Sequence, residues 1–420
     1  MNIDILLGLQ WGDEGKGKIV DVLSPRYDII ARFQGGPNAG HSLEFNNVKH
    51  VLHLIPSGIF HPDKINVIGN GMVIDPAIFR DEILNLGLPT EEIANRLVIS
   101  NKAHLILPTH RALDAAYEQG KGDLKIGSTL KGIGPAYTDK TGRNGLRIGD
   151  ILKKDFIRIY EDLRMAHKSI LDSLNYSYET GEYEAGWLEG VELMRKFRII
   201  NTEYFINNQI SKGKRILAEG AQGTMLDLDF GSYPFVTSSN TISAGACTGL
   251  GIPPSITGEV FGIFKAYCTR VGSGPFPTEL NDETGEKIRK IGREYGATTG
   301  RPRRCGWLDL PALKYAIMIN GVTKLFLTKA DVLSGFESVK ICTSYKTGGR
   351  RCNELPYDHS EIIDPVYTEL PGWYENISGV KAYSDLPATL VDFIRFIENE
   401  TNVPVTMVSV GPDRTQTILR

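Results

Sequence analysis

The sequence predicts an α/β protein with a large central sheet, mostly parallel, that is flanked by helices. Residues 3–7 form a short apolar run, which a glycine-rich turn and an apolar helical stretch follow at 8–24. Later apolar runs, at 28–33, 259–269 and 324–328, also end in loops rich in glycine or polar residues. Short continuous apolar runs are typical of buried parallel strands, and the loops at their carboxyl ends gather at one edge of the sheet.

The chain has 420 residues, enough for one large α/β domain or for about two or three domains of average size. No low-complexity linker marks a boundary, so we predict a single domain over residues 1–420. Within it, Phe156, Ile159, Tyr160 and Leu163 follow the spacing of one helical face, and a second helix is predicted over 187–199. We therefore expect a helical insertion over roughly 150–212 that takes no part in the chemistry.

The composition is that of an ordinary globular protein, with 41% hydrophobic and 23% charged residues. The formal net charge of −3 gives no reason to expect nucleic-acid or anionic-membrane partners. The five cysteines are widely spaced without a CxxC pair, which argues against a disulfide framework or structural zinc and favours a reducing compartment. The N-terminus lacks the pattern of a secretory leader, and no apolar run approaches the length of about 18 residues that spans a membrane. We expect a cytoplasmic protein.

Residues 12–18 (GDEGKGK) match the pattern G-x-x-x-x-G-K of a phosphate-binding loop. In such a loop, backbone N–H groups and the positive end of the following helix bind a phosphate. The position after Lys18 holds Ile19, where the usual pattern has a serine or threonine that binds Mg²⁺. Because Mg²⁺ prefers oxygen ligands, Asp13 is the predicted replacement. The alternative is a glycine-rich turn without a ligand, which does not explain the acidic and basic side chains crowded into the loop.

Two further glycine-rich loops are candidates for phosphate contact. Residues 34–41 (QGGPNAGH) follow the second predicted strand and end in His41, whose ring could donate a hydrogen bond to a phosphoryl oxygen. A lone histidine is more often structural, but the preceding Asn38, Ala39 and Gly40 favour the functional interpretation. Residues 127–135 combine glycine with small hydroxyl side chains, and Arg143 follows shortly after. For this third loop, phosphate contact and a flexible surface loop remain equally open.

Three segments in the second half of the chain carry side chains suited to nucleotide or carboxylate recognition. Gln222 and Thr237 are neutral hydrogen-bonding residues that suit a base edge or a phosphate. Residues 297–304 (ATTGRPRR) contain closely spaced arginines, which favour bidentate pairing with carboxylate or phosphate over contact with nucleic acid. Residues 328–331 (TKAD) follow an apolar run, and Asp331 could accept hydrogen bonds from N1–H and the 2-amino group of guanine. Adenine lacks this pair of donors, so Asp331 would select GTP over ATP.

These motifs resemble those of the adenylosuccinate synthetase family. They occur in the order typical of that family and span nearly the whole chain, and the first two together are highly specific. The matching segments are 10–18 (QWGDEGKGK), 35–41 (GGPNAGH), 132–137 (GIGPAY), 219–223 (EGAQG), 298–304 (TTGRPRR), 328–331 (TKAD) and 411–414 (GPDR).

The resemblance implies a GTP-dependent ligase that joins IMP and L-aspartate to form adenylosuccinate, with release of GDP and phosphate, in the first committed step from IMP to AMP. By the mechanism of the family, Asp13 removes the N1 proton of IMP, so that O6 attacks the γ-phosphorus of GTP while His41 stabilises the transferring group as a proton donor. The aspartate amine then displaces phosphate from 6-phosphoryl-IMP. The resemblance also implies GTP as co-substrate and one Mg²⁺ per subunit, held by Asp13 and the carbonyl of Gly40.

The resemblance further implies binding residues, position by position. Those implied for GTP are Gly12, Glu14, Gly15, Lys16, Gly17, Lys18, Gly40, His41, Ser42, Arg303, Lys329, Ala330, Asp331, Ser409, Val410 and Gly411. Those implied for IMP are Asp13, Lys16, Asn38, Ala39, Gly40, His41, Thr129, Arg143, Gln222, Thr237 and Arg301. Those implied for L-aspartate are Ala297, Thr298, Thr299, Gly300, Arg301 and Arg303. Arg143 would enter the active site of the other subunit, which implies a homodimer.

One position departs from the pattern of the family. Immediately before Gly132 the family usually has Gly-Arg, whereas this chain has Leu130 and Lys131. If that arginine helps to hold L-aspartate, Lys131 keeps the positive charge but loses the planar guanidinium fork. Lys131 in place of the arginine would therefore affect the affinity for L-aspartate.

Two other functions would use some of the same motifs. A GTP-binding regulatory switch would need a phosphate loop and a Lys-x-Asp motif, but it predicts a hydroxyl residue after Lys18 and a much shorter domain. A nucleotide kinase would pass phosphate to a stable acceptor and would need no site for a dicarboxylate. The ligase interpretation alone gives a role to the arginine-rich segment and to Asp13 and His41 together.

Overall fold

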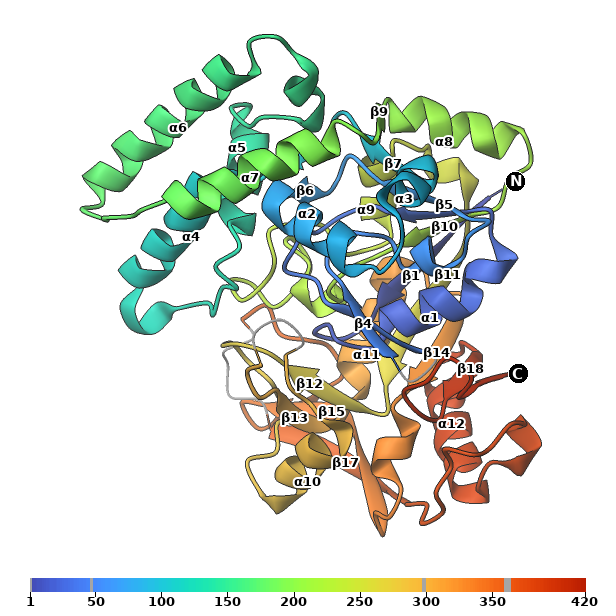
Figure 1. Cartoon of the computed structure of the whole chain (residues 1–420). Coiled ribbons are helices and arrows are strands. Elements are labelled where there is room, and N and C mark those ends of the chain that lie inside the picture. The colour runs from blue at the N-terminus through green and yellow to red at the C-terminus, as the bar shows by residue number, and fades with distance from the viewer. Residues whose placement is uncertain (1, 46–47, 297–299, 359–363) are drawn as a thin grey trace.

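A ten-stranded sheet runs through the centre of the molecule and is flanked by helices (Figure 1). The computed structural model describes residues 2–45, 48–296, 300–358 and 364–420. Within these residues, every neighbouring pair of strands in the sheet is parallel except β18 and β19. The strands in spatial order are β19 (Thr417–Leu419), β18 (Val405–Ser409), β14 (Lys324–Thr328), β11 (Thr257–Lys265), β1 (Ile3–Gly8), β10 (Ile216–Glu219), β2 (Ile29–Arg32), β5 (Ile65–Ile68), β7 (Leu97–Ser100) and β9 (Arg198–Ile200). The predicted α/β class with a large, mostly parallel sheet is confirmed.

The central strands are buried along nearly their whole length, which explains their continuous apolar sequence. Every residue of β2 and β10 is buried, and Asp4 is the one partly exposed residue of β1. The first helix, α1 (Lys16–Leu23), packs directly on these strands, because its Ile19 and Val20 share a buried cluster with Leu6 of β1. Burying an aliphatic side chain of this size contributes about 1.5–3 kcal/mol. The packing therefore fixes α1 beside the strand whose loop it follows.

Eleven further helices of more than one turn connect the strands within the described residues. They are α2 (Pro76–Asn85), α3 (Thr90–Arg96), α4 (Pro108–Gly120), α5 (Ile133–Gly142), α6 (Phe156–Ser173), α7 (Gly181–Met194), α8 (Thr202–Ser211), α9 (Ala244–Leu250), α10 (Glu283–Gly292), α11 (Leu310–Asn320) and α12 (Ala388–Thr401). In the part of the chain that the structure describes, none of the helices has the combined length and apolar character that crossing a bilayer requires.

The helices between residues 108 and 194 form a group at one end of the molecule, with α6 at its outer edge in the view of Figure 1. α6 contacts α4, which precedes the predicted insertion at 150–212. That range also contains β9, which pairs with β7 at the edge of the main sheet. The helix predicted over 187–199 is α7, which ends at Met194 before β9 begins. A strand of three residues is too short for its side-chain pattern to separate it from a neighbouring helix.

A second sheet of five strands lies beside the main sheet (Figure 1). Its strands are β12 (Tyr267–Arg270), β13 (Arg304–Asp309), β15 (Ser338–Thr347), β16 (Arg350–Cys352) and β17 (Asp364–Pro371). The single strand predicted at 259–269 is thus two strands, because the chain bends at Ala266 and passes from β11 into the second sheet. Both strands are buried there, so the apolar run continues across the bend. Two small pairs complete the strands, namely β3 (His41–Phe45) with β4 (Val48–Leu52) and β6 (Val73–Ile74) with β8 (His104–Leu105).

Candidate active site

The loops that follow β1, β2, β10, β14 and β18 meet in one cleft of about 910 Å³. Most of the residues predicted to bind substrates lie in its wall. They are Gly12, Asp13, Glu14, Gly15, Lys16, Gly17, Lys18, Asn38, Ala39, Gly40, His41, Ser42, Thr129, Gln222, Thr237, Arg301, Arg303, Lys329, Asp331, Ser409 and Gly411. The parallel topology therefore brings together segments from the two ends of the sequence.

The remaining predicted residues lie elsewhere. Ala330 and Val410 are buried next to residues of the wall, whereas Gly300 and Arg143 are exposed and are not among the residues that line the cleft. The predicted positions outside the described residues are Ala297, Thr298 and Thr299. The role of this second group in substrate binding therefore stays a prediction.

The phosphate-binding loop between β1 and α1 has an unusual backbone that Glu14 stabilises. Gly12, Asp13 and Gly15 have φ angles of 87°, 63° and 89°, in the left-handed region that glycine adopts without strain. The buried Glu14 carboxylate accepts hydrogen bonds from the backbone N–H groups of Gln10 (3.1 Å) and Gly12 (2.9 Å). A non-glycine residue in the left-handed region, such as Asp13, is typical of functional sites. The loop holds the Asp13 side chain in the wall of the cleft.

The two lysines of this loop have different partners. Lys16 Nζ lies 2.5 Å from Glu14 Oε2 at the start of α1. Lys18 Nζ donates hydrogen bonds to Ser409 Oγ (2.7 Å) and to the carbonyl oxygen of Gly411 (2.6 Å) in the loop after β18. Burial lowers the pKa of Lys18 to about 8. Lys18 thus joins the phosphate loop to the segment predicted to lie beside the base, whereas Lys16 pairs with Glu14 within the phosphate loop.

Asp13 contacts one of the arginines predicted to bind L-aspartate. Its Oδ2 lies 2.9 Å from Arg303 Nε. Arg303 Nη1 donates a hydrogen bond to Oε2 of the fully buried Glu294 (2.6 Å), and Lys265 Nζ donates to the other oxygen of that carboxylate (2.9 Å). Burial works to raise the pKa of Glu294, but the charges of Lys265, Lys329 and Arg303 lower it to about 2. Glu294 therefore stays ionised and holds Arg303 next to Asp13.

The donor atoms near Asp13 suit Mg²⁺. The Asp13 carboxylate is 30% exposed in the cleft, and Gly40 lines the same cleft. Mg²⁺ commonly binds through one or two carboxylates together with water and phosphate oxygens, so few protein ligands are needed. His110, Asp139 and His167 form another group of possible metal ligands, but two imidazoles suit other metals better than Mg²⁺.

His41 is the first residue of β3, and a carboxylate orients its ring. His41 Nδ1 lies 2.5 Å from Oε1 of Glu219, the last residue of β10. Glu219 also accepts hydrogen bonds from Ser57 Oγ (2.7 Å) and the Ser57 backbone N–H (2.8 Å). A Cβ atom at Gly17 would lie 2.8 Å from His41 Cβ, so α1 packs directly on this residue. Because the buried His41 Nε2 has no hydrogen-bond partner among the described residues, it is available to a ligand in the cleft.

The charges around His41 set its protonation. Burial lowers the pKa of His41, although the neighbouring Glu219 acts in the opposite direction. Burial also works to raise the pKa of Glu219, but the hydrogen bond with His41 and the charge of Arg32 keep that pKa below its ordinary value. Arg32 is fully buried and is the residue opposite Glu219 in the pairing of β2 with β10. A phosphate bound beside His41 would favour the imidazolium form, because an opposite charge stabilises it.

Further polar atoms in the cleft wall have no partner among the described residues. Both amide atoms of Gln222 are buried and unpaired, and the backbone of this residue has a φ angle of 56°. Asn38 Oδ1 is also unpaired, while its Nδ2 donates to Thr237 Oγ1 (3.3 Å). Buried polar atoms are rarely left without a hydrogen bond. These side chains are therefore placed for a ligand that has both donors and acceptors, such as a purine nucleotide.

The loop after β14 carries Lys329 and Asp331 into the cleft wall. Thr328 Oγ1 donates to the carbonyl oxygen of Glu14 (2.8 Å), which fixes this loop to the phosphate loop. Lys329 has a φ angle of 60°, and its Nζ donates to the carbonyl oxygen of Gly292 (2.9 Å). Burial raises the pKa of Asp331, although the charge of Lys329 acts against this. The Asp331 carboxylate therefore lies in the wall of the same cleft as the phosphate loop.

The third glycine-rich loop is attached to α4 by acidic side chains. Asp114 accepts hydrogen bonds from Ser128 Oγ (2.7 Å) and the backbone N–H of Gly132 (2.9 Å). Glu118 accepts a hydrogen bond from the Ser128 backbone N–H (3.1 Å). Thr129 of this loop lies in the cleft wall. Of the two interpretations left open by the sequence, these contacts favour a loop that belongs to the binding site.

Lys131, where the sequence departs from the family pattern, is half-buried and is not among the residues that line the cleft. Burial and the nearby charge of Arg111 lower the pKa of Lys131. A contribution of Lys131 to L-aspartate binding therefore stays a prediction.

Sequence reasoning missed three carboxylates that support the site. They are Glu219 behind His41, Glu294 behind Arg303, and Asp114 behind the third loop. Glu219 offers one usable signal, because a glutamate directly after the apolar run 216–218 has to be buried or paired. Local sequence marks neither Glu294 nor Asp114, since each contacts its loop from another element.

Comparisons with known proteins agree with this geometry. A sequence model of the family described as adenylosuccinate synthetase matches residues 5–418. The chain belongs to the adenylosuccinate synthetase family. It is similar to the adenylosuccinate synthetases of Phocaeicola vulgatus and Parabacteroides distasonis, each 60% identical over 420 residues that cover 100% of this chain and 99% of the relative. It is also similar to the fully ligated adenylosuccinate synthetase from Plasmodium falciparum, at 40% identity and a TM-score of 0.94 over 100% of both chains.

Membership of the adenylosuccinate synthetase family establishes the class of reaction. The chain is a GTP-dependent ligase that joins IMP and L-aspartate to give adenylosuccinate in AMP biosynthesis. The resemblance and the function that the sequence predicted are confirmed. A regulatory GTP-binding switch and a nucleotide kinase do not account for this relationship.

Proposed function

We propose that ligation proceeds through 6-phosphoryl-IMP, with Asp13 as the base and His41 as the proton donor to the transferring phosphoryl group. The observation that carries this proposal is the placement of both side chains in the wall of one cleft, with His41 Nε2 buried and unpaired. Phosphoryl transfer depends on positioning and on neutralisation of charge more than on covalent help from the protein. The cleft has the charged groups for both.

In the first step, Asp13 takes the N1 proton of IMP, and the electron pair shifts to O6. O6 then attacks the γ-phosphorus of GTP, the new O–P bond forms, and the bond to the β–γ bridging oxygen breaks to release GDP. The imidazolium form of His41 donates from Nε2 to an oxygen of the transferring group, while Glu219 holds Nδ1. Lys16, at the start of α1, adds positive charge beside the phosphates.

In the second step, the amine of L-aspartate attacks C6 of the intermediate. The C6–N bond forms and the C6–O bond breaks, so that the former O6 leaves with phosphate, and the amine nitrogen gives one proton to the departing phosphate. Arg301 and Arg303 both line the cleft, and their planar forks match the carboxylates of L-aspartate. Arg303 already lies against Asp13, which would place L-aspartate close to the reacting atoms of IMP.

We assign Asp13 and the Gly40 carbonyl as the protein ligands of one Mg²⁺ per subunit. Both lie in the cleft wall and offer hard oxygen donors. When bound, the ion neutralises charge on the phosphates of GTP. Asp331 and Lys329 read guanine in this proposal, while Asn38, Thr129, Gln222 and Thr237 contact IMP.

We also propose that the enzyme acts as a cytoplasmic homodimer in which Arg143 enters the active site of the partner subunit. Arg143 is exposed at the end of α5 and is not among the residues that line the cleft of its own chain. The cysteines at 247, 268, 305, 342 and 352 are all unpaired, which suits a reducing compartment.

The reaction is tested by following purine absorbance with IMP, Mg²⁺ and L-aspartate. We expect an absorbance change that requires L-aspartate and that depends on GTP in preference to ATP. With IMP labelled with ¹⁸O at O6, we expect the label to appear in inorganic phosphate. Release of unlabelled phosphate would contradict the 6-phosphoryl intermediate, and GTP hydrolysis without an IMP-dependent absorbance change would contradict ligation.

The shared active site is tested by mixing two variants that we expect to have strongly reduced activity on their own, Asp13→Asn and Arg143→Leu. In a mixed dimer, one site carries both changes and the other site carries neither. Random exchange gives about half mixed dimers, so we expect the mixture to regain about a quarter of the wild-type activity. Activity that stays at the level of the separate variants, in a mixture where subunit exchange is demonstrated, would contradict a role of Arg143 in the partner's site.

Replacing Glu219 with glutamine tests the protonation of His41. The neutral amide can still accept from His41 Nδ1–H, but it removes the negative charge that favours the imidazolium. The pKa of His41 should fall. As the pH rises, the variant should therefore lose activity at a lower pH than the wild type does. A decrease of one pKa unit reduces the protonated fraction about tenfold above the pKa. We expect kcat at pH 7.5 to fall by about tenfold and the alkaline limb of the pH profile to move to lower pH.

The matched control is Ser57→Ala, which removes one hydrogen bond to Glu219 Oε1 and keeps the carboxylate charge. We expect this variant to leave the position of the alkaline limb nearly unchanged. An alkaline limb in Glu219→Gln that coincides with that of the wild type would show that Glu219 does not set the protonation of His41.

A further inference from the structure

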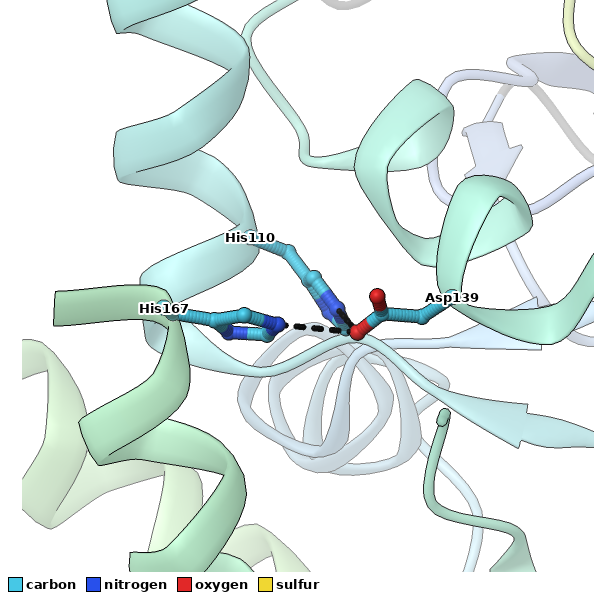
Figure 2. Close-up of side chains that lie close together, drawn as sticks. All are labelled: His110, Asp139 and His167. Carbon is cyan, nitrogen blue, oxygen red and sulfur yellow. Dashed lines mark hydrogen bonds and ion pairs between the residues drawn. The ribbon is translucent and has the colours of Figure 1, made fainter. Parts of the chain in front are cut away.

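A histidine–aspartate–histidine cluster joins three helices (Figure 2). His110 comes from α4, Asp139 from α5 and His167 from α6. His110 Nε2 lies 2.9 Å and His167 Nε2 lies 2.8 Å from the same oxygen, Asp139 Oδ2. Both imidazoles are buried, and neither histidine is among the residues that line the cleft. The function described above leaves this cluster without a role.

The hydrogen-bond partner of His110 Nδ1 fixes where the proton of that ring lies, and the partner of His167 Nδ1 is compatible with the same arrangement. The backbone N–H of Leu107 donates to His110 Nδ1 (2.9 Å), so Nδ1 carries no proton and Nε2–H points at Asp139. His167 Nδ1 faces Thr109 Oγ1 (2.7 Å), whose hydroxyl is able to donate in the same way. Although burial raises the pKa of Asp139, the hydrogen bonds from His110 and His167 lower it well below its ordinary value. Asp139 is therefore an ionised acceptor between two donors.

This arrangement of protons is wrong for a metal site. A metal at His110 Nε2 would need that nitrogen to be deprotonated, and Nδ1–H would then have to donate to an acceptor. The group that faces Nδ1 is itself a donor, the backbone N–H of Leu107. The geometry therefore favours a hydrogen-bonded anchor over a bound ion.

The anchor acts on the turn that carries Arg143. The carbonyl oxygen of Asp139 accepts hydrogen bonds from the backbone N–H groups of Asn144 (2.9 Å) and Gly145 (3.2 Å). The N–H of Arg143 closes the end of α5 on the carbonyl oxygens of Asp139 and Lys140, with a φ angle of 65° at Arg143. Asp139 thus fixes this turn through its backbone while the two histidines fix its side chain. Thr138, which precedes Asp139 in the sequence, lines the cleft.

We propose that His110 and His167 are positioning residues that act through Asp139 on Arg143, and so determine how well the enzyme binds IMP. This inference rests on the proposed function, in which Arg143 contacts IMP in the partner's site. A displacement of about 1 Å at a substrate-positioning group is enough to cost about 10²-fold in rate. An anchor at the base of the Arg143 turn is therefore placed to control IMP binding from outside the cleft.

The experiment is a double-mutant cycle between His167→Leu and Arg143→Ala. We expect His167→Leu to raise KM for IMP by about tenfold or more, with a much smaller change in KM for GTP. In the Arg143→Ala background the same substitution should have almost no further effect on KM for IMP, because residues that act through one another are not additive. His167→Gln keeps an amide donor toward Asp139 and should restore part of the affinity.

A control separates positioning from general loss of stability. Tyr160→Phe removes a partly buried hydrogen bond from α6 to Glu184 and leaves Asp139 untouched, so it should lower the melting temperature without raising KM for IMP. Equal effects of His167→Leu with and without Arg143 would overturn the inference while leaving the proposed function intact. An Arg143→Ala variant with wild-type KM for IMP would instead overturn the role of Arg143 itself, and the inference with it. One equivalent of Zn²⁺ bound by the wild type and lost in His167→Leu would show a metal site in place of the anchor.

Discussion

Replacing Asp13 with asparagine should reduce kcat by about 10³-fold or more while the fold is retained. Asparagine has no basic oxygen to accept the N1 proton of IMP, and an amide is a weaker ligand for Mg²⁺ than a carboxylate. The substitution also removes the partner of Arg303 Nε. The backbone should tolerate it, because asparagine is among the residues that adopt the φ angle of 63° found at this position. The measurement is kcat at saturating IMP, GTP and L-aspartate, with thermal unfolding as the test of the fold.

A matched control makes the same chemical change away from the cleft. Asp63 is 69% exposed and pairs with Lys64, so Asp63→Asn removes the same charge without touching a substrate. We expect its kcat to equal that of the wild type. If Asp13→Asn retained more than about a tenth of the wild-type kcat, then Asp13 would not be the base, since loss of a general base costs at least about 10²-fold.

The sequence was sufficient to predict the parts of the site that depend on local patterns. Residues 12–18 predict a phosphate loop because glycines and lysines occur at a spacing that a strand, a turn and a helix impose. Parallel strands also end at one edge of the sheet, so the loop at 34–41 and the TKAD segment at 328–331 were expected to meet. The structure places all three in the wall of one cleft.

The parts that the sequence did not predict depend on contacts between distant elements. Arg32 and Glu219 become neighbours only through the pairing of β2 with β10. Lys18 contacts Ser409 only because β18, from the C-terminal part of the chain, belongs to the same sheet as β1. The bend at Ala266 and the strand β9 were missed for another reason. A buried apolar run has the same sequence pattern whether it continues in one sheet, enters a second sheet, or adjoins a helix.

The Asp139 anchor depends partly on a local sequence pattern and partly on contacts between distant elements. The segment 132–137 was recognised as a motif, yet its neighbour Asp139 gains its partners from α4 and α6, which the sequence pattern alone does not place beside α5. The helical insertion predicted at roughly 150–212 contains α6 and is expected to take no part in the chemistry. The contact of His167 with Asp139 connects α6 to the turn of Arg143.

Replacing Asp331 with asparagine should change the nucleotide preference of the enzyme from GTP toward XTP. The carboxylate offers two acceptors, which match N1–H and the 2-amino group of guanine. The asparagine amide keeps one acceptor but brings a donor against the 2-amino group, and an unmatched polar pair in a buried site is costly. Xanthine has a carbonyl oxygen at position 2, which the amide donor matches. We expect kcat/KM for GTP to fall by about 10²-fold or more and kcat/KM for XTP to rise above it.

The comparison with Asp413→Asn shows whether this effect comes from base recognition or from charge. Asp413 lies in the loop after β18, and its charge acts on Lys18 as that of Asp331 does. Its carboxylate accepts from the Thr415 backbone N–H, which an asparagine can also do. Loss of charge alone would change the two variants alike and would weaken GTP and XTP together. A preference for GTP that survives in Asp331→Asn would mean that another residue reads guanine, whereas a switch confined to this variant assigns the reading to Asp331.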